Sequence, residues 1–479
     1  MAGLDPENWS ALRALGHQML DDMFTQIEHR HQQPVWTPMP HKAREELRQS
    51  LPHDGCSLPE IYECFQELIV PYDNGNRHPR FMGWVHGAGT PIGMLAEMLA
   101  GGLNANCGGR DHAAIEVERE VLRWAREMVG LPVETGSGCL VTGSSMANFI
   151  AVITASRTYQ PALRQQGVRH HALVGYAPES AHGCLPRAFD IAGLGSDALR
   201  KIPTDGAHRV NVAALREQIK RDRAAGLEPF MIAGTAGTVD CGAVDPLDHL
   251  ADVAQEEQLW FHVDGAFGAL ACLSPHYAPL LKGIERADSV AFDFHKWAQV
   301  PYDAGCVLVR DGKRHAAAFA QSLDYLVRED RGLAGNAPWF CDFGPDLSRG
   351  FRALKVWMTL SHYGADRMGQ VVDKSCAVAR HLAQQIDRTD GVTLLAPVTL
   401  NIVCFTVDAL SDDALSELVK DLHETGIAAP STTRINGQLA IRAAIVNHRT
   451  ETQDVDQMLD AVIALATKRL NAGVHEHKS

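Results

Sequence analysis

Lys296 lies near the end of SVAFDFHKW, residues 289–297, and its position at the end of this run suggests a chemical role. The run is apolar and rich in β-branched and aromatic residues, which predicts a buried strand that stops at a charged cluster. Burying a lysine is costly unless its amine is paired or chemically used. Taken alone, Lys296 is better explained as a surface lysine whose stem covers apolar neighbours.

Asp264 changes that interpretation. It ends a second apolar run, LWFHVD (residues 259–264), and small residues follow it. Two strands that deliver an aspartate and then a lysine to one edge of a sheet predict a pyridoxal phosphate site. Lys296 would form the Schiff base, and Asp264 would keep the ring nitrogen protonated so that the ring accepts electrons. The alternative for Asp264 is a helix N-cap before a small-residue turn.

The run DSVAFDFHKW, preceded by HVDGAFGA, resembles the group II pyridoxal-phosphate decarboxylases, a family that includes aromatic-L-amino-acid, glutamate and diaminobutyrate decarboxylases. The resemblance extends from about Asp5 to Ala466. It implies a fold-type I enzyme of the α/β class. It also implies a homodimer with active sites at the subunit interface.

Residues Gly143, Ser144 and Ser145 form a small-residue turn between an apolar strand and a helix expected at 149–158. A turn that feeds a helix N-terminus presents backbone N–H groups and the positive end of the helix dipole to an anion. By resemblance, this turn binds the cofactor phosphate. The same resemblance assigns further residues to the cofactor, namely Asn148, Thr238, Ala266, Ser289, Asp293 and His295.

His182 and Tyr325 receive catalytic roles from the resemblance. His182 would stack on the cofactor ring, although an isolated loop histidine is more often solvated. Tyr325 would protonate the substrate Cα from a mobile loop at about residues 321–346. Its alternative is a packed tyrosine at the start of that loop.

The loop HPRFMGWVHG, residues 78–87, matches the part of the family that lines the substrate side-chain pocket, which places Trp84, Val85 and His86 there. Trp84 is compatible with an aromatic substrate, and it could equally be a core residue. Arg80, His86 and Arg110 could instead serve an acidic side chain. Residues 104–112 depart from the aromatic decarboxylases, so the substrate stays open.

The elements that must position these residues fall into three predicted domains: a helical arm at 1–75, a large cofactor-binding domain at 76–370 and a small α+β domain at 371–479. Strands and helices alternate from about 135 to 310, which indicates a mostly parallel, helix-covered sheet. Ligands of such sheets bind at the carboxyl ends of the strands, where the candidate residues lie. The arm would lie across a partner subunit, or cap its own. In the small domain we expect helices at 371–386 and 414–424, and strands near 392, 401–407 and 439–446.

Composition excludes several other classes. The formal net charge of −14 argues against nucleic-acid and anionic-membrane partners. No apolar run is long enough to cross a bilayer, and the N-terminus lacks a secretory pattern. The 11 cysteines contain no CxxC pair, which indicates free thiols and a cytoplasmic location. No histidine group has a zinc-like companion set, so no metal is expected.

Together these features predict decarboxylation of an L-amino acid to its amine and CO2, with aromatic substrates slightly favoured. An oxygen-dependent aldehyde synthase is the first alternative, and in related proteins it accompanies loss of the loop tyrosine or the stacking histidine. An aminotransferase would need Arg442 in the pocket to grip the substrate carboxylate. A cofactor-free scaffold would be expected to lose Lys296 or the phosphate turn, and both are present.

Overall fold

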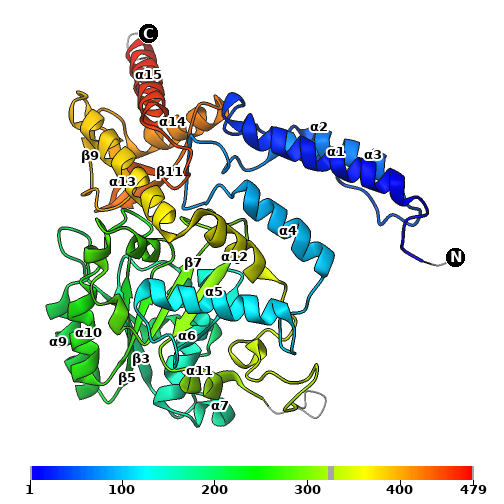
Figure 1. Ribbon diagram of the computed structural model, residues 1–479. Coiled ribbons are helices and arrows are strands. Elements are labelled where there is room, and N and C mark those ends of the chain that lie inside the picture. Colours follow the sequence, from blue (N-terminus) through cyan, green and yellow to red (C-terminus); the bar gives the residue numbers. More distant parts are fainter. Residues whose placement is uncertain (1–2, 322–327, 477–479) are drawn as a thin grey trace.

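The computed structural model describes residues 3–321 and 328–476, and a seven-stranded sheet forms its centre (Figure 1). The strand order is β2-β8-β7-β6-β5-β3-β4. Strands β3 to β7 run parallel, and β8 is antiparallel to both of its neighbours. The mostly parallel sheet predicted from the sequence is therefore confirmed. Its strands are β2 (Ser137–Val141), β3 (Leu173–Pro178), β4 (Leu199–Ile202), β5 (Glu228–Thr235), β6 (Trp260–Asp264), β7 (Ser289–Asp293) and β8 (Gly305–Val309).

Helices cover both faces of this sheet, because its strands are apolar on both sides. Helix α6 packs against β5 to β8 on one face, and α5 and α10 pack on the other. Helix α6 has buried residues around its whole circumference, as a helix enclosed by a sheet and other helices requires. The helices of this part are α4 (Pro91–Leu103), α5 (Ala113–Val129), α6 (Ser144–Tyr159), α7 (Leu163–Gln166), α8 (Cys184–Ile191), α9 (Val212–Ala224), α10 (Leu247–Glu257), α11 (Gly312–Phe319) and α12 (Arg352–Tyr363).

A second sheet of five strands has the order β1-β11-β12-β10-β9. Its first strand, β1 (Phe81–Met82), pairs in parallel with β11, so the loop at 78–87 is joined to the C-terminal sheet. The predicted domain boundary at residue 76 would assign β1 to the large domain, whereas its hydrogen bonds go to the small sheet. The other elements are β9 (Val392–Leu394), β10 (Ile402–Val407), β11 (Ala429–Ile435), β12 (Gln438–Ala444), α13 (Ala365–Asp387), α14 (Asp412–Glu424) and α15 (Thr452–Glu476).

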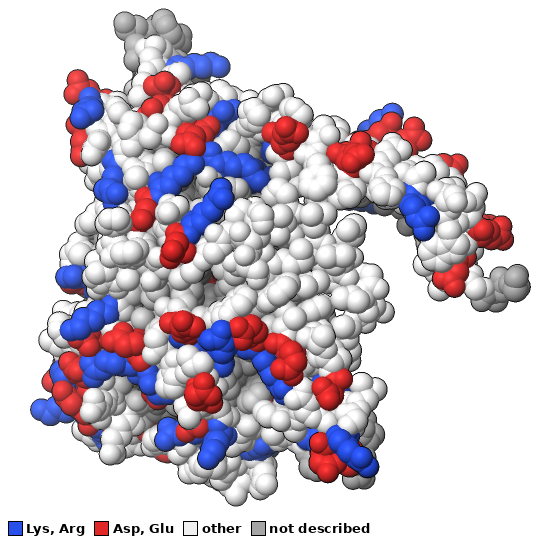
Figure 2. Space-filling model, viewed as in Figure 1, with Lys and Arg blue, Asp and Glu red and all other residues white. Residues whose placement is uncertain are grey.

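The N-terminal arm consists of α1 (Trp9–Glu28), α2 (His41–Glu46) and α3 (Leu58–Leu68), and it extends away from the body of the subunit (Figure 1). None of the residues of α1 is buried. Figure 2 shows that charged side chains gather on the body, whereas the surface over α4, beneath the arm, is largely free of them.

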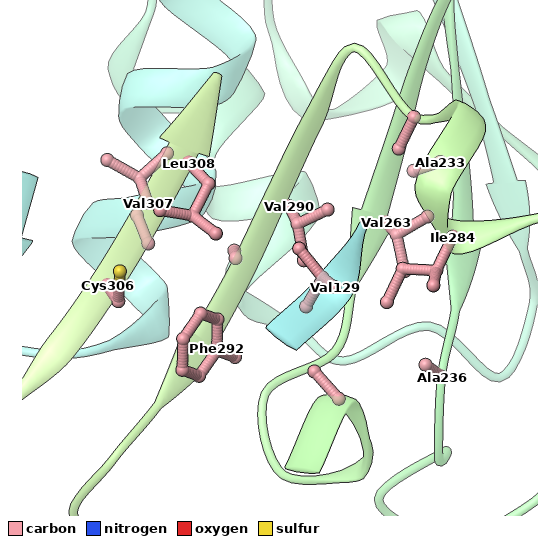
Figure 3. Packing of buried hydrophobic residues seen from close by; sticks show 14 of the residues in the cluster. Val129, Ala233, Ala236, Val263, Ile284, Val290, Phe292, Cys306, Val307 and Leu308 are labelled. Atoms are coloured by element: carbon pink, nitrogen blue, oxygen red, sulfur yellow. The ribbon is translucent and has the colours of Figure 1, made fainter. Parts of the chain in front are cut away.

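The hydrophobic core lies between the central strands and their helices (Figure 3). Val290 and Phe292 of β7 lie beside Val307 and Leu308 of β8, and all four are fully buried. This packing fixes the strand that leads to Lys296. Among the described residues, no helix is both long and apolar enough to cross a membrane.

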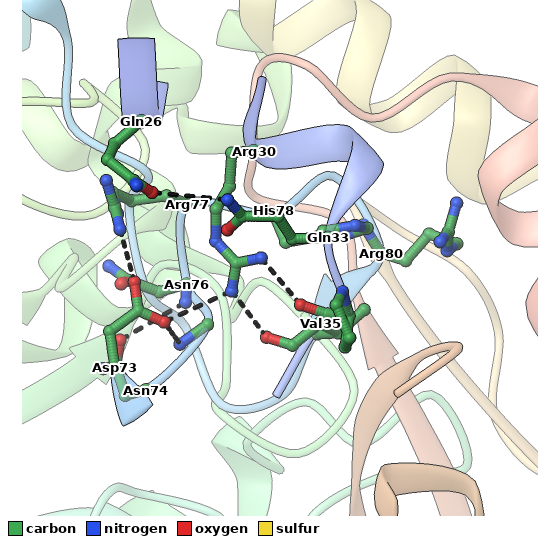
Figure 4. A network of polar contacts seen from close by, with 12 residues as sticks. Gln26, Arg30, Gln33, Val35, Asp73, Asn74, Asn76, Arg77, His78 and Arg80 are labelled. Carbon is green, nitrogen blue, oxygen red and sulfur yellow. Dashed lines mark hydrogen bonds and ion pairs between the residues drawn. The ribbon is translucent and has the colours of Figure 1, made fainter. Parts of the chain in front are cut away.

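Arg30 joins the arm to the loop that leads to the site (Figure 4). Its guanidinium is buried and donates to the carbonyl oxygens of Pro34 (2.7 Å) and Val35 (2.8 Å). It also donates to the Asp73 carboxylate at 3.2 Å. Burial lowers the pKa of Arg30, and the neighbouring Asp73 opposes that effect. The contact with Arg30 therefore anchors Asp73, the residue from which the segment leading to Trp84 begins.

Candidate functional site

A cavity of about 340 Å³ opens at the carboxyl ends of β5, β6 and β7. These ends meet because the three strands are parallel neighbours, which is where open α/β sheets bind ligands. Most of the residues predicted from the sequence line this one cavity. They are Trp84, Val85, His86, Gly143, Ser144, Ser145, His182, Asp264, Ala266, Asp293, His295 and Lys296.

Lys296 lies in the turn that follows β7, and its Nζ is 2.8 Å from Oδ2 of Asp293. The Ser144 hydroxyl donates to the same carboxylate oxygen. The other oxygen, Oδ1, is buried and has no hydrogen-bond partner among the described residues. The amine is therefore paired and oriented, while the side chain keeps access to the cavity.

Asp264 ends β6 and is almost completely buried. Its Oδ1 accepts a hydrogen bond from the Ala266 N–H at 3.1 Å, and its Oδ2 accepts one from Asn148 Nδ2 at 3.4 Å. Burial raises the pKa of Asp264, and the positive charge of Lys296 is the main effect that opposes that shift. A cationic group facing this carboxylate would favour its ionised form.

In the turn Gly143–Ser145, Gly143 is the N-cap of α6, and Ser144 and Ser145 are its first two residues, whose N–H groups have no partners within the helix. The next two N–H groups, of Met146 and Ala147, donate to the Gly143 carbonyl oxygen. Gly305 of β8 allows the turn to lie against the sheet, because a Cβ on Gly305 would come within 2.4 Å of Gly143 Cα. The free N–H groups and the helix dipole suit a phosphate. The Ser144 hydroxyl is already used by Asp293, so Ser145 is the freer hydroxyl of the pair.

His182 precedes α8 and lines the cavity with an exposed imidazole. Its Nδ1 accepts a hydrogen bond from the Cys184 N–H at 3.2 Å. In the neutral ring the proton is then on Nε2. A ring fixed in this way can lie against a flat ligand.

The loop at 78–87 brings a cluster of three rings to the cavity, of which Trp84 and His86 line it. The centroid of His86 lies 5.7 Å from those of Phe81 and Trp84, and the centroids of Phe81 and Trp84 are 6.1 Å apart. Burial lowers the pKa of His86, and the charge of Lys296 lowers it further. Gly87 lets this loop cross the Lys296 turn, because a Cβ there would come within 2.4 Å of the His295 and Lys296 carbonyl oxygens.

Three of the predicted cofactor residues do not line the cavity. Ser289 is the first residue of β7, and the four residues to Asp293 span about 13 Å of strand. Asn148 lies behind Asp264 and Cys184 rather than at the surface of the cavity. Thr238 uses its hydroxyl inside a turn, where it accepts from the Ala243 N–H at 3.0 Å. Tyr325 lies outside the described residues.

The three arginines left open by the sequence are engaged elsewhere. Arg80 donates to the Ile427 carbonyl oxygen at 2.6 Å. Arg110 lies over the Trp339 ring at 4.5 Å. Arg442 is buried and donates to the carbonyl oxygens of Val239 (2.7 Å) and Trp84 (2.9 Å).

Sequence reasoning missed several lining residues, of which Cys184 and Tyr302 matter most. Tyr302 follows Lys296 by six residues, and its ring lies 4.3 Å from that of His295. Cys184 begins α8 two residues after His182, and only that proximity could have indicated it. The remaining missed residues are Thr235, Gly237, Val239 and Phe267.

The donor set fits pyridoxal phosphate group by group. Lys296 offers an amine for the cofactor aldehyde, Asp264 a carboxylate for the ring nitrogen, and the turn before α6 a cradle for the phosphate. Among the described residues, no group of His, Cys, Asp or Glu side chains is arranged to hold a metal ion.

Comparisons with known proteins identify the family of this chain. The model of the pyridoxal-dependent decarboxylase conserved domain matches residues 40–408. Aromatic-L-amino-acid decarboxylase of Bacillus atrophaeus is 32% identical over 465 residues, which cover 95% of each chain. Phenylacetaldehyde synthase of Arabidopsis thaliana is 28% identical over 473 residues, again 95% of each. The crystal structure of Oryza sativa TDC with PLP and tryptamine has a TM-score of 0.90 and 26% identity, covering 98% of this chain and 100% of that chain. The chain therefore belongs to the group II pyridoxal-phosphate-dependent decarboxylases, enzymes of fold type I that use pyridoxal phosphate as their cofactor.

Proposed function

We propose that this enzyme decarboxylates an aromatic L-amino acid to the corresponding amine and CO2. The observation that carries the proposal is the composition of one cavity, which is lined by Lys296 and Asp264 together with the rings of Trp84 and His86. Among the described lining residues, Lys296 is the only lysine or arginine. An acidic substrate side chain would therefore lack a cationic partner there.

Each residue has a distinct task in this proposal. Bound pyridoxal phosphate supplies an electron sink that stabilises negative charge at the substrate Cα. Lys296 would hold the cofactor through its aldehyde, and the Asp264 carboxylate would accept a hydrogen bond from the protonated ring nitrogen. His182 fixes the plane of the ring, and Tyr325, which lies outside the described residues, donates the proton to Cα. Gly143, Ser144 and Ser145 hold the phosphate.

The aromatic preference is supported by Trp84 and His86. Trp84 remains 58% exposed in the subunit, so its ring face is available to a ligand. The Nδ1 atom of His86 is buried and has no hydrogen-bond partner in the part of the chain that the structure describes. Burial lowers the pKa of His86, which favours the neutral ring. A neutral imidazole suits an N–H or O–H group on an aromatic ring, and it is a poor partner for a carboxylate that needs a positive charge.

The alternatives are less well supported. An aminotransferase would need Arg442 free to grip the substrate carboxylate, whereas its Nε and Nη1 already donate to backbone carbonyl oxygens. Its Nη2 is buried and has no hydrogen-bond partner among the described residues. Aldehyde synthesis is favoured by the similarity to phenylacetaldehyde synthase. The presence of both His182 and Tyr325 in this chain supports plain decarboxylation instead.

We also propose a homodimer with active sites at the interface. The arm and α4 expose large apolar side chains, including Trp9 (58%), Met98 (55%) and Leu103 (66%). Figure 2 shows this side of α4 with few charges. Such a surface is typical of an interface between subunits.

We also propose the domain division at residues 75 and 370. The 11 free cysteines suggest a cytoplasmic location, which is part of the same proposal.

The test is a panel of L-amino acids supplied to the holoenzyme, with CO2, amine, aldehyde and hydrogen peroxide all measured. We expect tryptophan, tyrosine or phenylalanine to yield amine and CO2 in equal amounts. Preferential turnover of glutamate or aspartate would contradict the aromatic assignment. Aldehyde and peroxide as the main products would support the synthase alternative.

A further inference from the structure

Behind Asp264, a line of buried polar side chains crosses from β7 to α6. Trp260, His262 and Asp264 alternate along β6 and therefore point to one face of the sheet. His262 is in register with Ser289 of β7, and Asn148 comes from α6 on the same face. These five side chains are at most 6% exposed.

The hydrogen bonds in this line can be traced in one direction from Trp260. Its Nε1–H can only donate, and it donates to Ser289 Oγ at 2.8 Å. The Ser289 hydroxyl is then free to donate to His262 Nδ1, also at 2.8 Å. Burial lowers the pKa of His262 to about 3, so the ring is neutral at pH 7. When Nδ1 accepts from Ser289, the single ring proton is on Nε2.

The second half of the line follows from that tautomer. His262 Nε2–H donates to Asn148 Oδ1 at 2.6 Å, which fixes the orientation of the amide. The amide Nδ2 then donates one hydrogen to Asp264 Oδ2 at 3.4 Å and the other to Cys184 Sγ at 3.2 Å. Every donor in the line points toward Asp264. A protonated carboxyl group would place an O–H against the amide N–H, so this direction favours the carboxylate.

We propose that Trp260, Ser289, His262 and Asn148 form a positioning chain that holds Asp264 as an oriented carboxylate toward the cofactor ring nitrogen. This inference rests on the role proposed above for Asp264. It gives Ser289 and Asn148 a function although neither lines the cavity. His262 and Ser289 are positioning residues, because they act on the cofactor only through Asn148 and Asp264.

The first test compares binding of pyridoxal phosphate with binding of 1-deazapyridoxal phosphate, in which carbon replaces the ring nitrogen. Ser289→Ala should weaken binding of the natural cofactor about tenfold, the equivalent of one lost hydrogen bond. It should change binding of the deaza analogue less than about twofold, because that analogue has no nitrogen for Asp264 to face. His262→Gln should show the same discrimination.

Ser375→Ala is a matched control. Trp297 Nε1 donates to Ser375 Oγ at 3.2 Å, but Ser375 donates onward to the Val371 carbonyl oxygen within α13. Ser375→Ala therefore removes an equivalent Trp–Ser hydrogen bond and leaves the positioning chain intact. The Ser375→Ala variant should bind both compounds as the unsubstituted enzyme does. Equal weakening of both compounds in Ser289→Ala, or no weakening of either, would overturn the positioning chain.

Asp264→Ala separates this failure from failure of the proposed function. If Asp264→Ala discriminates between the two compounds and Ser289→Ala does not, only the chain is wrong. If Asp264→Ala binds both compounds equally well, the role proposed for Asp264 is wrong, and the positioning chain is then wrong as well.

The second test needs no cofactor. In apoenzyme with ¹⁵N-labelled histidine, the His262 signal is identified by its absence in His262→Gln. We expect the Nε2–H tautomer at pH 7 in the unsubstituted enzyme, and a mixture of tautomers in Ser289→Ala. A wild-type signal from the Nδ1–H tautomer would reverse the direction of the chain and overturn the proposal.

Discussion

Lys296 Nζ lies 2.8 Å from Asp293 Oδ2, and the two residues are separated by a single turn at the end of β7. The carboxylate is 1% exposed, and Lys296 is its cationic partner at hydrogen-bond distance. The contact explains how a lysine can be kept at the end of a buried strand. It also separates two properties of Lys296, its charge and its ability to bond covalently to the cofactor.

Substitutions of Lys296 should separate these two properties. Lys296→Arg retains a cation opposite Asp293 but has no amine for the cofactor, so the absorbance band at about 420 nm should be lost while stability is kept. Lys296→Ala should lose the band and also cost on the order of 1–3 kcal/mol of unfolding free energy, because Asp293 loses its cationic partner. Absorbance spectra and urea unfolding of the apoenzymes measure these effects. A band that persists in Lys296→Arg would contradict the assignment.

Trp84 provides a test of specificity. Trp84→Leu should lower kcat/KM for tryptophan about tenfold to hundredfold and leave kcat/KM for leucine nearly unchanged, because only the aromatic substrate loses a ring contact. Trp124→Leu, a partly buried position on α5 outside the cavity, is the control and should affect neither substrate. A parallel fall for both substrates in Trp84→Leu would indicate a packing role for Trp84.

The positions of Asp264, Lys296 and the turn at Gly143 could be predicted because each follows an apolar run, and parallel strands bring such ends together. Strand β11 was not predicted, because its Ser-Thr-Thr-Arg segment alternates between part-buried and exposed positions in place of an apolar run. The use of Ser289 could not be predicted either. Its role depends on register with His262, which a single strand does not encode.

Buried histidines should make the protein sensitive to acid. Burial lowers the pKa of His315 from its ordinary value of 6.5 to about 3. Between these two values the unfolded chain binds a proton that the folded chain does not, so the unfolding free energy falls as pH falls below 6.5. Between pH 7 and pH 5, the unfolding free energy of His315→Gln should therefore fall by about 2 kcal/mol less than that of the unsubstituted apoenzyme.

Urea unfolding at these two pH values measures the difference. His41 is the matched control, because its side chain is 80% exposed. His41→Gln should leave the pH dependence unchanged. Equal pH dependence in His315→Gln and the unsubstituted protein would show that another group accounts for the acid sensitivity.

The apolar side of α4 gives the last prediction. Met98 is 55% exposed on that helix, so Met98→Asp would place a charge in the proposed interface, where it has no partner and cannot be hydrated. We expect sedimentation to show a dimer for the unsubstituted protein and a monomer for Met98→Asp. Decarboxylation should be lost as well, because in the proposed dimer the active sites lie at the subunit interface. Leu280→Asp, at a 44% exposed position outside the arm and α4, should remain dimeric and active. A monomeric unsubstituted enzyme with full activity would contradict the interface, and it would leave the apolar arm to pack against a different protein.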